Sequence, residues 1–590
     1  MPIQQDGDPS MFSTYVFRNG SDGGASAMHS ALSEGAAVEA AAAAADRNAT
    51  EILNHLANDV KSLSNHVIFT DQNLDDFFFI INGILVLLMQ VGFACLESGS
   101  IQSKNVTNIM LKNFLDSLIC SMVFWICGYA LAFGDGNWFL GLTWWASIGM
   151  PDAFWSQWFF QYTFASTAST ILSGAVAERC SFVAYIAYSA LMSGVIYPIA
   201  IHWAWTEQGW LYALGFKDFG GGMLVHGLAG SACLVASILI GPRIGRFDGG
   251  QDSEKFTTGH SSALIGIGGI IILVGFCGFN AGTLNHYSLP DDGEKIARIV
   301  RNTLMCGAVS ALTVLFAGKL GVFGDRFWPF SLTVNGGIAG LVASCGGCDI
   351  YSALETVIVG FVTGFVYMAF RGVILFVQID DPLDSSPIHM ACGIWSVIAV
   401  PVVGNGGIFN HFSSQSQELL VQVEGVVAVF TWSLVCSIIL FGTLKLFKLL
   451  RSTKEEEFLG MDITKHRQIS YSINAPANNF NGKKHARAVF VRNIGYSFTD
   501  GNSNVKFYTT RICVVRYFVL MPQPQPQPQP QPAEPSSVMS TKMRRGAARR
   551  VASSPPLHQA PMANGNRQYQ PRIRVGKMTL MYLDLQPAAE

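Results

Sequence analysis

The chain has 590 residues, of which 50% are hydrophobic and only 13% are charged, and its mean hydropathy is +0.33. These values exclude a disordered chain, a coiled-coil protein, a disulfide scaffold and an ordinary cytosolic enzyme, and they favour an integral membrane protein with polar extensions. The net charge of −2 is uneven, because residues 521–590 hold nine Lys or Arg and three Asp or Glu. A basic tail of this kind favours contact with anionic lipid or a regulator.

Residues 1–72 form a polar leader. Its alanine run, Ala36–Ala45, predicts a helix, and residues 51–66 have a weaker helical periodicity. Asn19 and Asn48 each begin an Asn-x-Ser/Thr sequon, so both are candidate glycosylation sites if the leader is extracellular.

Eleven apolar stretches follow, each close to the 20 residues that span a hydrocarbon core. They cover residues 77–97, 113–134, 157–176, 181–202, 220–241, 262–284, 302–320, 328–346, 352–376, 388–405 and 422–447. The sequence therefore predicts an all-α membrane protein with eleven transmembrane helices, and an odd count places the termini on opposite sides. With the N-terminus outside, twelve Lys or Arg fall at inner loops and helix ends and four at outer loops. This bias favours an N-out, C-in orientation.

One pattern, Asp-x7-His-x3-Gly, occurs twice: it runs from Asp218 to Gly230 near the fifth span and from Asp381 to Gly393 near the tenth. The spans are five apart, so the second half is expected to run inverted relative to the first, as a 5+5 repeat with one additional helix. Inverted repeats place a transport site at their interface near the bilayer midplane. An ionisable side chain within a span is costly, and His226 and His389 at matched positions therefore indicate a functional pair.

Two buried imidazoles could ligate haem, ligate a metal or line a path for a small molecule that exchanges protons. No obvious thiolate or carboxylate set completes a metal site. Neutral imidazoles offer both a donor and an acceptor, which suits a small amine. The two aspartates have a structural alternative, because an Asp at a helix start caps free N–H groups without any substrate.

Several ordered stretches are specific enough to indicate a family. They are KNVTNIML at 104–111, GAVAER at 174–179, DFGGGMLVH at 218–226, GPRIGRFD at 241–248, GFNAG at 278–282, DDPLD at 380–384, HMACGIW at 389–395 and GMDITKH at 460–466. With these residues the chain resembles the ammonium transporters of the Amt type, closest to the plant and protist branch, from about residue 75 to 471. The resemblance implies a homotrimer with one pore per subunit, in the plasma membrane and in contact with its lipids. It implies ammonium or ammonia as substrate, methylammonium as an analogue, and no cofactor, enzymatic activity or nucleic-acid partner.

The resemblance also assigns roles to residues of the pore. It implies an outer ammonium site formed by Trp205, Phe160, Phe164, Thr283 and Asp218. It also implies a gate in which the rings of Phe164 and Phe279 stack. His226 and His389 match the twin histidines at the pore centre, and Asp381 is the pseudo-symmetric partner of Asp218. The implied mechanism recruits NH4+, removes its proton and conducts NH3 past the histidines, with or without separate proton transfer. Phe276 and Cys277 depart from the family pattern beside the gate.

The expected domains are the leader at 1–72, the transmembrane domain at 73–450, a cytosolic regulatory segment at 451–475 and a largely disordered tail at 476–590. That tail contains a Pro-Gln spacer at 522–532. By resemblance, Thr464 matches the threonine that a kinase phosphorylates to close the trimer.

Three other functions stay open at this point: a related Rh-type channel for NH3 or CO2, an ammonium sensor that uses the same pore, and a bis-histidine haem protein. The resemblance to an aromatic cage and a regulatory tail favours the transporter.

Overall fold

The computed structural model describes residues 37–248, 259–410 and 412–471, together with four two-residue strands between residues 486 and 517. The strands pair in twos, β1 (Ala486–Arg487) with β4 (Arg516–Tyr517) and β2 (Thr499–Asp500) with β3 (Ser503–Asn504). The all-α prediction therefore holds for the described residues up to 471, and the strands are a small departure from it in the segment expected to be disordered. Asn19 and most of 476–590 lie outside the described residues.

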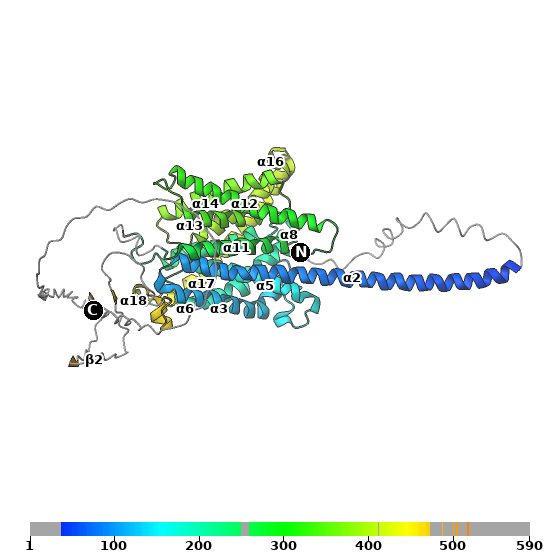
Figure 1. Ribbon diagram of the computed structural model, residues 1–590, viewed down its shortest axis with the longest axis horizontal. Helices are drawn as coiled ribbons and strands as arrows, with labels where there is room; N and C mark the ends of the chain where they lie inside the picture. Colours follow the sequence, from blue (N-terminus) through cyan, green and yellow to red (C-terminus); the bar gives the residue numbers. More distant parts are fainter. Residues whose placement is uncertain are drawn as a thin grey trace, which may run out of the picture. The chain divides into compact units, whose positions relative to one another are not determined.

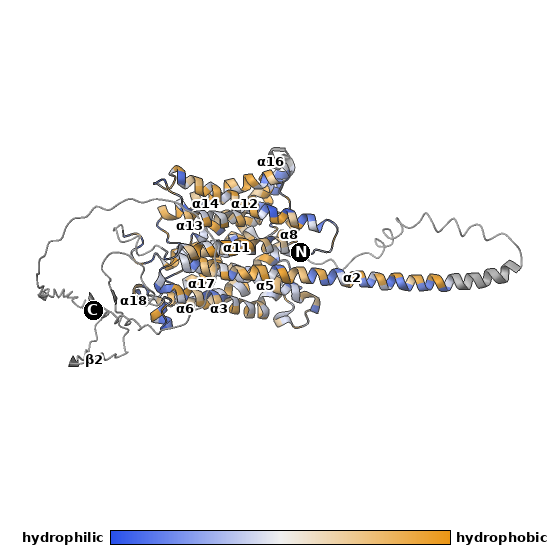
Figure 2. Ribbon diagram, viewed as in Figure 1, coloured by the Kyte–Doolittle hydropathy of each residue, from blue (hydrophilic) through white to orange (hydrophobic). Residues whose placement is uncertain are grey.

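Helices, some long and some of only one turn, build the body of the protein (Figure 1). In chain order they are α2 (Ala37–Ser100), α3 (Val106–Val123), η2 (Phe124–Gly128), α4 (Tyr129–Phe133), α5 (Trp155–Ala175), α6 (Phe182–Leu191), η5 (Met192–Ile196), α7 (Tyr197–Trp205), α8 (Trp210–Leu214), η6 (Gly222–Gly227), α9 (Leu228–Ile240), α11 (Ser262–Gly282), α12 (Asp292–Leu320), α13 (Phe330–Ser344), α14 (Ala353–Phe376), η7 (Ser386–Ala391), α15 (Cys392–Val403), α16 (Gly407–Asn410) and α17 (Phe412–Leu446). Apolar residues dominate the helices of this body (Figure 2).

Within the described residues, nine helical segments are long and apolar enough to cross a membrane. All eleven expected stretches coincide with helices, but two helices fall outside the nine. Phe330–Ser344 is short, and Trp155–Ala175 is rich in Ser, Thr and Gln. The second helix tolerates these polar residues because nearly all of it is buried; for example, Thr167 bonds to a carbonyl of its own helix and Ser169 bonds to Asp116. The count of eleven spans and the orientation remain predictions.

Helix α2 differs most from the expected organisation. It runs without interruption from Ala37 to Ser100, so the expected boundary between residues 72 and 73 falls inside a helix. The two short helices expected in the leader belong to this one element, and Asn48 lies on it. Helical propensity continues across the boundary because neither Gly nor Pro interrupts residues 37–82.

The two segments that carry the repeated pattern pack reciprocally. Helix α9 contacts η7, and α15 contacts η6, while α17 packs along α9 and α15. This crossing brings the two copies of the Asp-x7-His-x3-Gly pattern together in the interior.

Candidate functional site

His226 and His389 meet at the crossing. Their Nδ1 atoms lie 3.2 Å apart, and the rings stack with centroids 5.3 Å apart at 18°. Both side chains are buried. Two Nδ1 atoms at this distance share one hydrogen, so one imidazole donates there and the other accepts. The Nε2 atoms must then differ, one being an acceptor and the other a donor. The His226 Nε2 atom has no hydrogen-bond partner within the described part of the chain.

Each histidine lies on a short π-helical turn that an aspartate caps. On η6, the Oδ2 atom of Asp218 accepts hydrogen bonds from the backbone N–H groups of Met223 (2.9 Å) and Leu224 (2.8 Å). On η7, the carboxylate of Asp381 accepts bonds from the N–H groups of Ser385 (3.0 Å) and Ser386 (2.7 Å). A wide π turn moves a side chain out of the regular α-helical register, and such turns recur at functional sites. The same arrangement on both elements aims one imidazole at the other.

The glycines of the repeat let the two pore elements cross closely. A Cβ atom added at Gly230 would overlap the backbone of His389 and Met390. A Cβ atom added at Gly393 would overlap the carbonyl oxygen of Gly222 and the backbone of Gly227. Because each glycine faces the histidine-bearing turn of the other half, the identical spacing in the two copies of the repeat has a packing cause.

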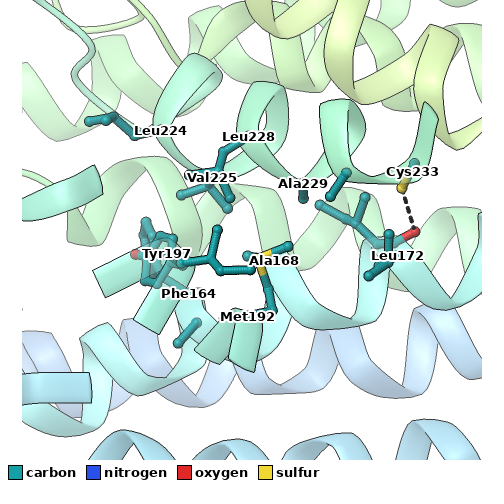
Figure 3. Packing of buried hydrophobic residues seen from close by; sticks show 14 of the residues in the cluster. Phe164, Ala168, Leu172, Met192, Tyr197, Leu224, Val225, Leu228, Ala229 and Cys233 are labelled. Atoms are coloured by element: carbon teal, nitrogen blue, oxygen red, sulfur yellow. Dashed lines mark hydrogen bonds between the residues drawn. The ribbon is translucent and has the colours of Figure 1, made fainter. Parts of the chain in front are cut away.

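Three aromatic rings, those of Phe279, Phe164 and Trp205, follow one another from His226. Phe279 lies 5.3 Å from His226 between ring centroids and stacks on Phe164 at 3.9 Å and 16°. The Phe164 ring meets Trp205 edge-on at 6.1 Å. Figure 3 shows Phe164 in the packed layer where α5 meets η6 and α9, close to Val225. The stacked pair therefore separates the histidines from the Trp205 side.

A cavity of about 310 Å³ opens on that side, and we call it the Trp205 cavity. Its lining includes Phe164, Trp205, Asp218 and Thr283 of the expected ammonium site. Thr283 donates its hydroxyl hydrogen to the carbonyl oxygen of Phe279 at 2.9 Å, which leaves the oxygen lone pairs to accept from a ligand. The Trp205 indole N–H donates to the backbone carbonyl of Asp218 at 3.0 Å and so fixes the ring.

Phe160 is placed differently from the other expected cage residues. It is fully buried, contacts Phe164 (4.8 Å between centroids) and Phe79 (5.6 Å), and is not among the residues that line the Trp205 cavity. A Cβ atom at Gly282 would overlap the Phe160 ring. Phe160 therefore supports Phe164 from behind.

Asp218, together with Asp349, supplies negative charge to the lining of the cavity. Burial raises the pKa of its carboxyl to about 6, while the N–H groups of the capped turn act in the opposite direction. The group is therefore ionised at neutral pH and takes up a proton near pH 6. Its Oδ1 atom has no hydrogen-bond partner among the described residues.

The segment after α17 docks on the start of α3. It contains α18 (Lys454–Leu459) and α19 (Met461–His466). The Asp462 carboxylate accepts from the backbone N–H groups of Thr107 (3.1 Å) and Asn108 (2.9 Å), and it thus caps α3. Thr464 is half-buried two residues after Asp462, and its hydroxyl donates to the carbonyl oxygen of Gly460 at 2.9 Å. A phosphate at Thr464 would place negative charge beside the Asp462 carboxylate.

Sequence reasoning missed some residues that complete the site. Phe276, noted only as a departure, stacks on His226 at 5.3 Å and 21°. Its neighbour Cys277 is half-exposed and bonds to the carbonyl of Leu273. Tyr212, Phe216 and Asp349 line the Trp205 cavity from separate segments. The helical spacing of Phe276 and Phe279 could have indicated that Phe276 lies beside the pore. Tyr212, Phe216 and Asp349 share no local sequence pattern that could have indicated the cavity.

Comparisons with known proteins identify the family of the chain. The sequence model of the Ammonium Transporter Family matches residues 77–471. Ammonium transporter Amt2 of Archaeoglobus fulgidus is 35% identical over 427 residues, which are 66% of this chain and 87% of that protein. Ammonium transporter 3 of Dictyostelium discoideum is 33% identical over 412 residues, 66% of this chain and 91% of that protein. Among solved structures, one titled "Sensor Amt Protein" is 31% identical, with a TM-score of 0.61, and covers 67% of this chain and 99% of its own. The chain belongs to the ammonium transporter family.

Proposed function

We propose that this protein carries ammonium across the plasma membrane, by binding NH4+ in the Trp205 cavity and passing NH3 along the twin histidines. One observation carries the proposal: the cavity, the stacked Phe164–Phe279 pair and the two imidazoles follow one another through the interior by successive ring contacts. We further propose eleven spans with the N-terminus outside, so that this cavity faces the exterior.

The first step is recruitment of the cation. Aromatic faces attract ammonium through the ring quadrupole, by up to about 2 kcal/mol where water is excluded. Trp205 supplies such a face, Thr283 supplies an acceptor oxygen, and Asp218 supplies negative charge without direct contact. Together they select a small cation that also donates hydrogen bonds.

The second step is transfer of a proton from the ammonium ion to a histidine of the pair or to a relay. A bare ammonium ion in an apolar passage costs several kcal/mol or more in desolvation, and neutral ammonia avoids most of that cost. The histidine pair lies beyond the phenylalanines and offers one acceptor and one donor at its Nε2 atoms. NH3 both accepts and donates, so it can bond to this pair, whereas K⁺ has no proton to release and accepts no hydrogen bond.

The proposal is tested by uptake of labelled methylammonium into proteoliposomes that contain the purified protein. The expected result is saturable uptake that ammonium competes for and K⁺ does not. A matched preparation of the His226→Ala, His389→Ala double variant serves as control, and its uptake should fall at least tenfold. Uptake indistinguishable from empty liposomes would reject transport.

Regulation belongs to the same proposal. We propose a homotrimer in which the docked segment 451–471 permits transport and phosphorylation of Thr464 by a kinase stops it, because the added charge of about −2 opposes the Asp462 cap.

A sensor is the second candidate function. The likeness to the structure titled "Sensor Amt Protein" covers nearly the whole of that chain. A sensor would keep the ammonium-binding cavity, so binding without flux in the liposome assay would favour it.

A further inference from the structure

Helix α2 extends well past the ends of the other helices (Figure 1). From residue 50 to residue 70 every side chain except the half-buried Ser64 is exposed. The exposed side chains include large apolar ones, which a helix surrounded by water does not normally carry in a continuous row. Figure 2 shows apolar and polar residues alternating along this projecting part.

The apolar residues follow a heptad pattern. Leu53, Leu56, Val60, Leu63, Val67, Thr70, Leu74 and Phe77 are separated alternately by three and four residues, and all are exposed. In heptad notation, the a positions hold Leu or Val and the d positions hold Leu, Thr and Phe. A period of 3.5 residues is the signature of helices that wind around each other, because it keeps one stripe facing the partner. The composition of the whole chain excluded a coiled-coil protein, but this pattern is confined to about 25 residues.

The f positions agree with this stripe as a contact, whereas Ile68 at a b position and Phe69 at a c position are exposed apolar residues outside it. The f positions, which face away from it, are Asn58, Asn65 and Gln72, and these are polar. The Thr70 hydroxyl at a d position donates to the carbonyl oxygen of His66 at 2.8 Å, so no unpaired donor enters the contact. In a parallel pair, the g residue of one helix faces the e residue of the next heptad on the other. His66 and Asp71 hold such positions, with complementary charge when the histidine is protonated.

The stripe does not stop where the body of the protein begins. Ile81, Ile84, Leu88 and Val91 continue the alternation of three and four residues, and they are exposed on the face of α2 opposite to its packed side. Among the described residues nothing covers either part. One unbroken exposed stripe thus runs along α2, and its projecting part lies beyond the ends of the other helices.

We propose that residues 53–77 of α2 form a parallel coiled coil with the same segment of a second copy of this chain. Copies in one membrane share an orientation, so their projecting helices point the same way. Membrane anchoring also raises their effective concentration. Val at two a positions with Leu at two d positions favours two strands, so in the homotrimer proposed above the coil pairs two of the three copies or joins copies of neighbouring trimers. Because copies of this chain share orientation and membrane, the partner is a second copy. The heptad pattern of each helix, and not a docking groove, makes the pairing specific.

Single cysteines test the proposal, because the first native cysteine is Cys95 and the projecting segment has none. Leu63→Cys occupies a d position, and the matched control Asn65→Cys lies two residues away at an f position. Membranes containing the full chain are treated with a short bismaleimide and resolved on denaturing gels, with the unsubstituted chain as background. Methylammonium uptake by the reduced variants shows that both are folded.

The expected result is at least tenfold more crosslinked dimer with Leu63→Cys than with Asn65→Cys, and the same contrast for Val60→Cys against Asn58→Cys. If nearly all of the chain is converted to crosslinked dimer, the coil has two strands. If the crosslinked fraction of the chain levels off at about two thirds, the coil has three strands, because the reagent joins only two of three cysteines. Both outcomes support self-association through the stripe. Equal crosslinking at stripe (a or d) and f positions, or none above background in either, would overturn the proposal and leave the stripe to the lipid surface or another protein.

Discussion

Replacing Asp218 by Asn should separate the two roles of this residue. Both backbone N–H groups of the η6 turn donate to one carboxylate oxygen, at 2.9 and 2.8 Å. The single carbonyl oxygen of an asparagine can accept both bonds, while its NH2 group takes the place of the unpartnered Oδ1 atom. Asp218→Asn thus keeps the cap and removes the charge, whereas Asp218→Ala removes both.

The sizes of the two effects follow from the structure. A cavity of about 310 Å³ is about 8 Å across, and two opposite unit charges at about 8 Å interact by about 2 kcal/mol at an effective dielectric constant of 20. Asp218→Asn should therefore weaken apparent ammonium affinity about 30-fold. Asp218→Ala removes two charge-assisted hydrogen bonds, each of which contributes about 1.5–3 kcal/mol to the free energy of unfolding. Part of that loss is offset because the variant no longer buries a charge. We expect a net loss of about 1–3 kcal/mol and little protein at the surface.

The assay is surface biotinylation followed by methylammonium uptake at pH 7 and pH 5. Because burial raises the pKa of Asp218 to about 6, the wild-type carboxylate is charged at pH 7 and mostly protonated at pH 5. Apparent affinity should fall on acidification in the wild type and fall less in Asp218→Asn, because Asp349, whose pKa burial also raises to about 6, is then the one of these two cavity carboxyls that still titrates. An asparagine variant with wild-type affinity at pH 7, or an alanine variant with normal surface level and rate, would refute this reasoning.

Three further predictions concern separate parts of the protein. Gly393→Ala forces a methyl group against the backbone of η6, and overpacking of about 1–3 kcal/mol should lower both thermal stability and uptake. In the control Gly372→Ala the added methyl group meets no atom within 4 Å, so thermal stability and uptake should stay unchanged. Thr464→Asp should silence transport at a normal surface level and Thr464→Ala should not, so a fully active Asp variant excludes the switch. Trp205→Leu should raise the apparent KM about tenfold through loss of the aromatic face, with kcat nearly unchanged; an unaltered KM argues against the cage.

The repeat in the sequence predicted that the two histidines lie together, and the structure confirms this. Equal spacing of Asp, His and Gly in two spans was enough to place His226 and His389 together, because inverted halves meet at an axis. The π turns that aim the rings could not be foreseen, since they depend on the aspartate caps and on the crossing at Gly230 and Gly393.

Other features were set by packing that no local pattern records. Composition marks residues 1–72 as polar, yet the helix continues through the boundary at residue 72. Ser and Thr residues lower the hydropathy of Trp155–Ala175, so hydropathy alone does not mark it as a span. In the structure nearly all of this helix is buried, and hydroxyl groups such as those of Thr167 and Ser169 are hydrogen-bonded within the protein. The family pattern placed Phe160 in the cage, whereas its contacts put it behind Phe164.

The most direct test of the twin-histidine mechanism is the current carried by K⁺ relative to ammonium in cells that express His226→Asp or His389→Glu. The account predicts that an acidic side chain at either position admits K⁺ and abolishes the preference for ammonium, because it stabilises an intact cation where the imidazoles accept a proton. Oligomers should form normally on native gels, since these residues set selectivity and not assembly. If both variants keep full selectivity for ammonium over K⁺, the proposed deprotonation at the histidine pair is contradicted.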